Sequence, residues 1–111
     1  MPVANCYIKN GKVTQNEVHE LASKWAKAIH VDAKDICITF IPDCIQGGQQ
    51  YKILVNLYLP SLWSEKNIKN MQLSLFTILK NHFQYEKHEI FVITSIVQSG
   101  HVLEGGELIE W

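Results

Sequence analysis

The sequence predicts an α/β (α+β) fold: a tandem β-α-β repeat that forms a four-stranded mixed sheet with two helices on one face. Two amphipathic helical patterns each lie between two short apolar runs that are rich in β-branched residues. The residues expected to cap the helices, Thr14 and Ser64, are 50 positions apart (64 − 14), although residue identity between the halves is poor. If the two strands of a unit are parallel, the crossover that joins them is right-handed.

The length and composition are those of a single domain. The chain has 111 residues, of which 47% are hydrophobic and 19% are charged. These values exclude a disordered or fibrous protein. We therefore predict one domain over residues 1–111, made of repeat units over about 2–48 and 49–111 that are joined edge to edge.

The first unit is predicted as strand, helix, strand. Residues 3–9 form a mostly apolar stretch that ends before a turn. Thr14 and Glu17 have the spacing of a capping box, in which each side chain satisfies a free backbone N–H at the helix start. The apolar spacing that follows predicts a helix of about four turns ending near His30. The β-branched run at 36–41 is the second strand.

The second unit repeats this order. Residues 47–50 are predicted as a loop and the run at 51–59 as a strand. Ser64 is the expected N-cap of a second helix, whose buried stripe ends at Phe83. The apolar, β-branched run at 90–97 is the fourth strand.

One face of the predicted sheet has no helix to cover it. That face carries much apolar area, which a monomer does not leave in contact with water. We therefore expect it to pack against other subunits. An uncovered face predicts an oligomer but not the number of its subunits.

The charge balance excludes nucleic acid as the expected partner. Ten basic and eleven acidic residues give a formal net charge of −1, so no basic excess is available to neutralise phosphates. All the basic residues are lysines, and the chain contains no arginine.

The three cysteines, Cys6, Cys37 and Cys44, are odd in number and widely spaced. This pattern argues against a disulfide scaffold and against a structural zinc site, so we expect reduced thiols, no metal and a cytoplasmic location. No apolar run approaches the roughly 18 residues that a membrane span needs. The first residues also lack the pattern of a secretory leader, so we expect no membrane association.

The most specific motif lies near the end of the sequence. Residues 100–108, Gly-His-Val-Leu-Glu-Gly-Gly-Glu-Leu, closely resemble the C-terminal segment of 4-oxalocrotonate tautomerases. Pro2 follows Met1, as in the whole tautomerase superfamily, and residues 10–12, Asn-Gly-Lys, match its glycine–basic pair after the first strand. Residues 38–48 are similar to the second strand and loop of macrophage migration inhibitory factor relatives. The resemblance covers essentially the whole chain, as two family units fused in one polypeptide.

The resemblance implies a homotrimer whose sheets face inward. It also implies catalysis on a small-molecule substrate by the amino group of Pro2, once Met1 is removed. A free proline nitrogen is a secondary amine on a rigid ring, and burial lowers the pKa of such an amine toward the working pH. The neutral nitrogen can take a proton from an enol hydroxyl or an α-carbon and return it elsewhere along the conjugated system. This keto–enol isomerisation requires no metal or cofactor.

The resemblance assigns further site residues position by position, and each departs from the family pattern. Lys12 stands where the family has an arginine that binds a substrate carboxylate, contributed across a subunit boundary. Lysine keeps the charge but lacks the bidentate fork. The second family arginine falls near Thr39 in the first unit and near Phe91 in the second, and Val102 replaces an aromatic residue. Lys12, Thr39 and Val102 are therefore the substrate-binding candidates.

Two hypotheses about function follow from these residues. The first is a tautomerase acting on a small enol or 2-keto acid, with Pro2 as base and then acid. It has one site per chain, because the equivalent position in the second unit, near Ile53, is internal. The second is a non-catalytic tautomerase-fold trimer with a binding or structural role, favoured by the missing arginines. Retention of Met1 favours it too, because the Pro2 nitrogen is then an amide. Hydration, dehalogenation or decarboxylation by a protonated Pro2 is disfavoured, because related enzymes of that kind add arginines.

Overall fold

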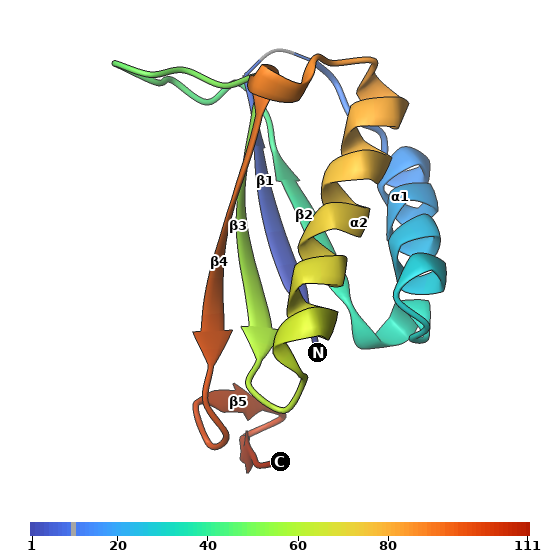
Figure 1. Cartoon of the computed structure of the whole chain (residues 1–111), viewed down its shortest axis with the longest axis vertical. Helices are drawn as coiled ribbons and strands as arrows, with labels where there is room; N and C mark the ends of the chain where they lie inside the picture. Colours follow the sequence, from blue (N-terminus) through green and yellow to red (C-terminus); the bar gives the residue numbers. More distant parts are fainter. Residues whose placement is uncertain (10) are drawn as a thin grey trace.

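The computed structural model describes residues 1–9 and 11–111, and it shows a four-stranded sheet with two helices on one side (Figure 1). Residue Asn10, part of a predicted motif, lies outside the described residues. In chain order the elements are β1 (Val3–Ile8), α1 (Gln15–Ala28), η1 (Ala33–Asp35), β2 (Cys37–Ile41), β3 (Ile53–Pro60), α2 (Glu65–Phe83), η2 (Lys87–Glu89), β4 (Ile90–Val97), β5 (Val102–Glu104) and β6 (Glu107–Ile109). The two η elements are short 3₁₀ turns that precede β2 and β4.

The four main strands are arranged in the order β2-β1-β3-β4. β1 is parallel to β2, and β3 is parallel to β4. The two units meet where β1 runs antiparallel to β3. Both helices cover the same face of the sheet (Figure 1). The predicted fold, a four-stranded mixed sheet built from two β-α-β units, is confirmed.

Both helices begin at the predicted caps. Thr14 Oγ1 accepts a hydrogen bond from the Glu17 N–H at 3.1 Å, and Glu17 Oε1 accepts one from the Thr14 N–H at 3.3 Å. Ser64 Oγ accepts a hydrogen bond from the Asn67 N–H at 3.2 Å. α1 ends two residues before the predicted boundary, because the positive φ of 60° at His30 takes the chain out of the helical conformation. In the part of the chain that the structure describes, no helix is long and apolar enough to cross a membrane.

β3 extends one residue beyond its predicted end, through Pro60. Proline has no N–H to donate to a neighbouring strand, which is why a strand is expected to stop before it. Here the N–H of the following residue, Ser61, donates to the Val97 carbonyl oxygen at 2.9 Å and continues the pairing of β3 with β4. The strand therefore tolerates the proline at its last position.

One hydrophobic core lies between the sheet and the helices, and both units contribute to it. Trp25 on α1 is fully buried and donates its Nε1–H to the Met71 carbonyl oxygen of α2 at 3.2 Å. The buried residues of the central strands and the helices include Ala4, Cys6, Ile8, Leu21, Trp25, Ala26, Ile53, Val55, Leu57, Leu59, Ile68, Met71, Leu75 and Leu79. Because successive residues of a strand point to opposite faces, alternate residues of β1 and β3 enter this core.

The opposite face of the sheet is open in the single chain. Phe91 and Ile93 of β4 are 37% and 52% exposed. Asn5 of β1 lies opposite both Thr39 and Asn56, so a polar row crosses the middle of this face. Both helices lie on the other side (Figure 1). This is the face expected to pack against other subunits.

The tail motif forms a small β-hairpin. β5 and β6 pair antiparallel with Glu104 opposite Glu107, so Gly105 and Gly106 make the two-residue turn. Their φ angles of 61° and 80° are both positive, as the tightest type of hairpin turn requires. The hairpin lies at the same end of the sheet as the start of the chain (Figure 1).

Candidate active site

Pro2 lies immediately before β1, and its side chain is fully buried. Its carbonyl oxygen accepts a hydrogen bond from the Cys37 N–H at 3.0 Å, which joins the start of β1 to the start of β2. Pro2 is two residues before the buried Ala4, so strand alternation directs both side chains to the helix-covered face. The proline ring is therefore held in place by the core of the protein itself.

A cavity of about 560 Å³ opens beside Pro2, and four segments of the chain contribute to it. These are the start of the chain, the segment around η1, the loop between β3 and α2, and the β5–β6 hairpin. The lining residues are Met1, Pro2, Val3, Val31, Lys34, Asp35, Ile36, Cys37, Trp63, Glu104 and Ile109. A largely apolar lining with a few charged groups, at this volume, is typical of small-molecule sites.

Three charged residues, Lys34, Asp35 and Glu104, line this cavity together with Met1, whose amino group begins the chain. Burial lowers the pKa of this amino group below its ordinary value, and the carboxylates of Asp35 and Glu104 act in the opposite direction by favouring its charged form. Lys34 is presented by a turn in which Asp32 Oδ1 accepts a hydrogen bond from the Lys34 N–H at 3.1 Å. The site thus combines an amine that loses its proton more readily with a cation able to bind an anionic group.

The cysteines are free thiols in different surroundings. Burial raises the pKa of Cys6 to about 12, which keeps that thiol protonated in the core. Cys37 is exposed at the cavity, with its Sγ 3.8 Å from Thr39 Oγ1. Among the described residues, no three histidine, cysteine, aspartate or glutamate side chains are grouped to hold a metal ion.

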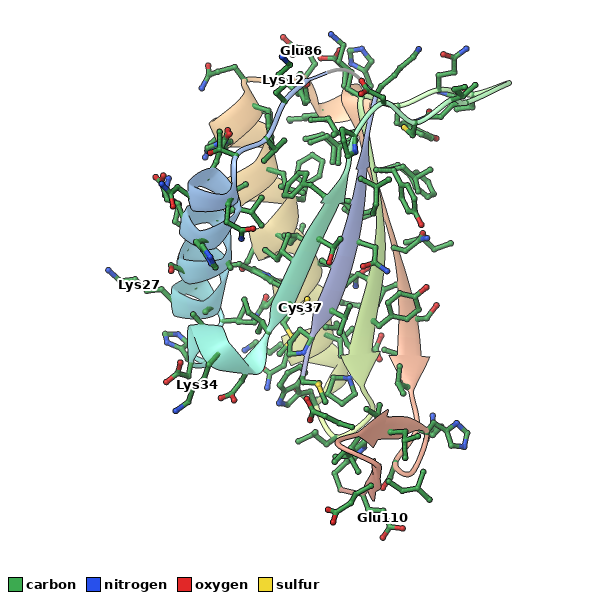
Figure 2. The ribbon with its side chains drawn as sticks, turned by 180° about the vertical axis from the view of Figure 1, so that it is seen from behind. Lys12, Lys27, Lys34, Cys37, Glu86 and Glu110 are labelled. Carbon is green, nitrogen blue, oxygen red and sulfur yellow. The ribbon has the colours of Figure 1, made fainter. Side chains whose placement is uncertain are left out.

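Of the four predicted site residues, only Pro2 lines this cavity within the described chain. Lys12 lies at the opposite end of the molecule from Lys34 (Figure 2), because the six residues of β1 carry the chain roughly 20 Å away from its start. Thr39 is exposed on β2, on the face of the sheet away from the helices. Val102 is half-buried at the start of the hairpin. A single chain does not bring these three residues to Pro2, and their roles stay predictions for a site completed by another subunit.

The structure adds Lys34, Trp63, Glu104 and Ile109 to the site. The predicted parallel pairing of the first two strands could have indicated that Lys34 lies near Pro2. The residues before two parallel strands meet at one edge of the sheet, and Pro2 and Lys34 precede these two strands. The other three residues follow β3 and β4. They reach the same edge only because the second unit joins the first in the antiparallel direction.

No protein-family profile and no curated protein sequence matches this chain. Several solved structures do match it. A native fused 4-OT superposes with a TM-score of 0.78 at 10% identity, covering 96% of this chain and 94% of that chain. N1, a member of the cis-3-chloroacrylic acid dehalogenase family, gives 0.74 at 9% identity, with 96% and 82% covered. Macrophage migration inhibitory factor from Toxoplasma gondii gives 0.68 at 10% identity, with 96% and 99% covered.

These three structures belong to the tautomerase superfamily, and the match extends over nearly the whole chain. At such low identities the likeness concerns the path of the backbone rather than the chemistry of the site. The predicted resemblance is confirmed at that level: this chain has the fold of the tautomerase superfamily.

Proposed function

We propose that this protein is a cofactor-independent tautomerase that acts on a small enol or 2-keto acid, with the Pro2 nitrogen as base and then as acid. The observation that supports this most is the position of Pro2, buried beside a cavity of about 560 Å³ that also holds Lys34 and Glu104. Removal of Met1 converts the Pro2 nitrogen from an amide into a secondary amine. The same surroundings that lower the pKa of the Met1 amino group then act on an amine one residue further along.

In the proposed reaction the Pro2 nitrogen takes the proton of the enol hydroxyl. The electron pair left on oxygen forms the carbonyl, and the former C=C pair takes a proton back from the Pro2 ammonium at carbon. The proton is returned, so substrate and product are isomers and the enzyme ends in its starting state. Such positioned proton transfer accelerates a reaction by roughly 10²–10⁴-fold.

Lys34 is the proposed binding partner for the substrate carboxylate, because it is a cationic residue among those that line the cavity beside Pro2. The carboxylates of Asp35 and Glu104 line the same cavity. One cation beside two carboxylates favours a substrate with one negative charge over a substrate with two. We therefore propose a monocarboxylate with an apolar body, which Trp63 and the aliphatic lining residues can accommodate.

We propose that the active form is a homotrimer. Structural neighbours are described as an asymmetric trimer of R7 fused 4-OT and a symmetric trimer of Q0 fused 4-OT. The half-exposed Phe91 and Ile93 on the open sheet face give this chain an apolar surface that subunit contacts would cover. Such contacts would bring Lys12 of one subunit near the site of another.

The test begins with the intact mass of the purified protein, which shows whether Met1 is removed. Ketonisation of enol phenylpyruvate, with one carboxylate, and of 2-hydroxymuconate, with two, is then followed for the wild type and Pro2→Ala. We expect Pro2→Ala to lower kcat/KM by roughly 10²–10⁴-fold, and the wild type to prefer phenylpyruvate. Pro42→Ala, at an exposed proline outside the cavity, is the matched control and should retain wild-type rates.

Equal rates in the wild type and Pro2→Ala would contradict the catalytic role. Retained Met1 together with no turnover above buffer would favour the alternative function, a non-catalytic trimer with a binding or structural role. Light scattering then distinguishes a trimer from other assemblies.

A further inference from the structure

The β5–β6 hairpin forms one wall of the Pro2 cavity, through Glu104 and Ile109. Each of its strands contains three residues. A two-stranded hairpin is at best marginally stable by itself in water. Contacts outside the hairpin must therefore fix its position over the cavity.

Trp111 makes two such contacts. Its backbone N–H donates a hydrogen bond to Ser99 Oγ at 2.7 Å, and its indole Nε1–H donates one to Ser61 Oγ at 3.0 Å. Ser99 follows β4 and Ser61 follows β3, and these two strands are neighbours in the main sheet. Trp111 therefore connects the end of the hairpin to the ends of two strands.

The bond from Trp111 to Ser61 also joins two walls of the cavity. Ser61 is fixed because its N–H donates to the Val97 carbonyl oxygen at 2.9 Å. It lies two residues before Trp63, which lines the cavity from the β3–α2 loop. The hairpin, with Glu104, is thus tied to the loop that carries Trp63.

We propose that Trp111 is a positioning residue, whose indole bond to Ser61 holds the hairpin so that Glu104 stays inside the Pro2 cavity. The inference rests on the proposed function for its role in catalysis. It adds a residue that acts through Glu104 and does not touch the reacting atoms.

Three charged residues line the cavity at the start of the chain: Lys34 and Asp35 from the η1 turn and Glu104 from the hairpin. The carboxylates of Asp35 and Glu104 act on the amino group there. Only Glu104 depends on the position of the hairpin. If the hairpin is released, the amine loses a carboxylate that raises its pKa and also loses part of the burial that lowers its pKa. The Glu104→Gln background separates the two effects, because only the loss of burial remains there.

The test compares Ser61→Ala and Trp111→Phe, which remove the two ends of the same hydrogen bond from the full-length protein. Ser23→Ala, at an exposed serine of α1, is the matched control. The first measurement is amide hydrogen exchange of the hairpin. We expect both variants to accelerate exchange by about 2- to 10-fold, as the loss of one neutral hydrogen bond predicts, and Ser23→Ala to exchange like the wild type.

The second measurement is an NMR titration of the amino group at the start of the chain, on whichever residue intact mass identifies there. We expect Glu104→Gln to lower the pKa of this amine, because the substitution removes a carboxylate and leaves the hairpin in place. We expect Ser61→Ala and Trp111→Phe to shift the amine pKa further downward, or less far upward, in the wild type than in the Glu104→Gln background.

Unchanged hairpin exchange in Ser61→Ala would overturn the proposal. A change in the amine pKa on Ser61→Ala that is the same in the wild type and in the Glu104→Gln background would overturn it too. A Glu104→Gln variant with the wild-type amine pKa would overturn it as well, as would equal effects in Ser23→Ala. Ser61→Ala answers the question even if Trp111→Phe does not fold. Neither measurement uses turnover, so an inactive wild type contradicts the proposed function while this test stays decisive.

Discussion

Pro2 and Ile53 occupy equivalent positions in the two β-α-β units. Cys37, two positions beyond η1, pairs with Val3. Phe91, two positions beyond η2, pairs with Leu54 in the same way. Pro2 and Ile53 directly precede these partners, and both are fully buried. The nitrogen of Ile53 lies in a peptide bond inside the chain, whereas the nitrogen of Pro2 becomes free when Met1 is removed. The same backbone geometry thus supports amine chemistry in one unit only.

The charged groups at the two ends of the sheet also differ. Near Ile53, Lys52 Nζ lies 3.5 Å from Glu89 Oε2 and 5.3 Å from the centroid of the Tyr85 ring. The cavity there measures about 230 Å³, against about 560 Å³ beside Pro2. Lys34 instead lines the larger cavity. A repeated fold therefore yields one candidate site, because the second copy uses its charges for contacts within the chain.

The largest expected effect tests whether the two units form one domain. Leu21 of α1 and Leu75 of α2 are both fully buried. We expect Leu21→Ala and Leu75→Ala each to lower the free energy of unfolding by about 2–5 kcal/mol, because each leaves a cavity in the core. Circular dichroism and tryptophan fluorescence during denaturation should give one coincident transition for both variants. Two separate transitions, one for each unit, would contradict the single domain over residues 1–111.

The next prediction tests the difference between the charged groups at the two ends of the sheet. Lys34 and His88 hold equivalent positions, one residue before the ends of η1 and η2. We expect Lys34→Gln to raise KM for a monocarboxylate substrate by about 10- to 100-fold, the loss of a hydrogen bond to a charged group. His88→Gln serves as the control in steady-state kinetics and should leave KM unchanged. A similar KM in both variants would remove Lys34 from the binding site.

A smaller effect compares the helix caps of the two units. Thr14 takes part in a complete capping box, whereas Ser64 accepts one hydrogen bond. We expect Thr14→Ala and Ser64→Ala each to cost about 1 kcal/mol of stability, with the larger loss for Thr14→Ala. Urea denaturation measures the difference, and Ser23→Ala, exposed in the middle of α1, controls for the loss of a hydroxyl. The reverse order would show that the second bond of the box adds nothing.

The smallest effect concerns a side-chain hydrogen bond between the two helices, which joins His82 of α2 to Glu17 of α1. His82 Nε2 lies 2.5 Å from Glu17 Oε2, and this hydrogen bond, followed by that of the Thr14 N–H, lowers the pKa of Glu17. The unfolded chain then binds the proton more readily, so the stabilisation is complete above the ordinary glutamate pKa. It is lost as the pH falls through the lowered native pKa.

We expect this contribution to be at most about 1 kcal/mol, because the pair is partly exposed. Urea denaturation from pH 6 downward should show a smaller loss of stability in Glu17→Gln than in the wild type below about pH 4. Parallel curves for the two proteins would show that this contact does not contribute to acid sensitivity.

Local sequence patterns predicted most of the fold. The caps at Thr14 and Ser64 were correct because a cap depends on residues three positions apart. The run at 90–97 matches β4 residue for residue. The end of β3 at Pro60 was misplaced by one residue, because its pairing depends on the Ser61 N–H reaching β4, more than 30 positions away in the chain (97 − 61 = 36). Patterns within one segment do not contain that information.

The candidate site likewise depends partly on local sequence patterns and partly on contacts between distant segments. The sequence by itself determined the order of the two helices and the four main strands, the repeat, and Pro2 as the candidate catalytic residue, because these depend on neighbours along the chain and on a short motif. The β5–β6 hairpin was not predicted. Only the tertiary structure decided that Lys34, Trp63 and Glu104 share the cavity with Pro2 and that Lys12 does not. The physical reason is strand pairing: it brings together residues that are far apart in sequence, while the extended β1 separates residues that are close.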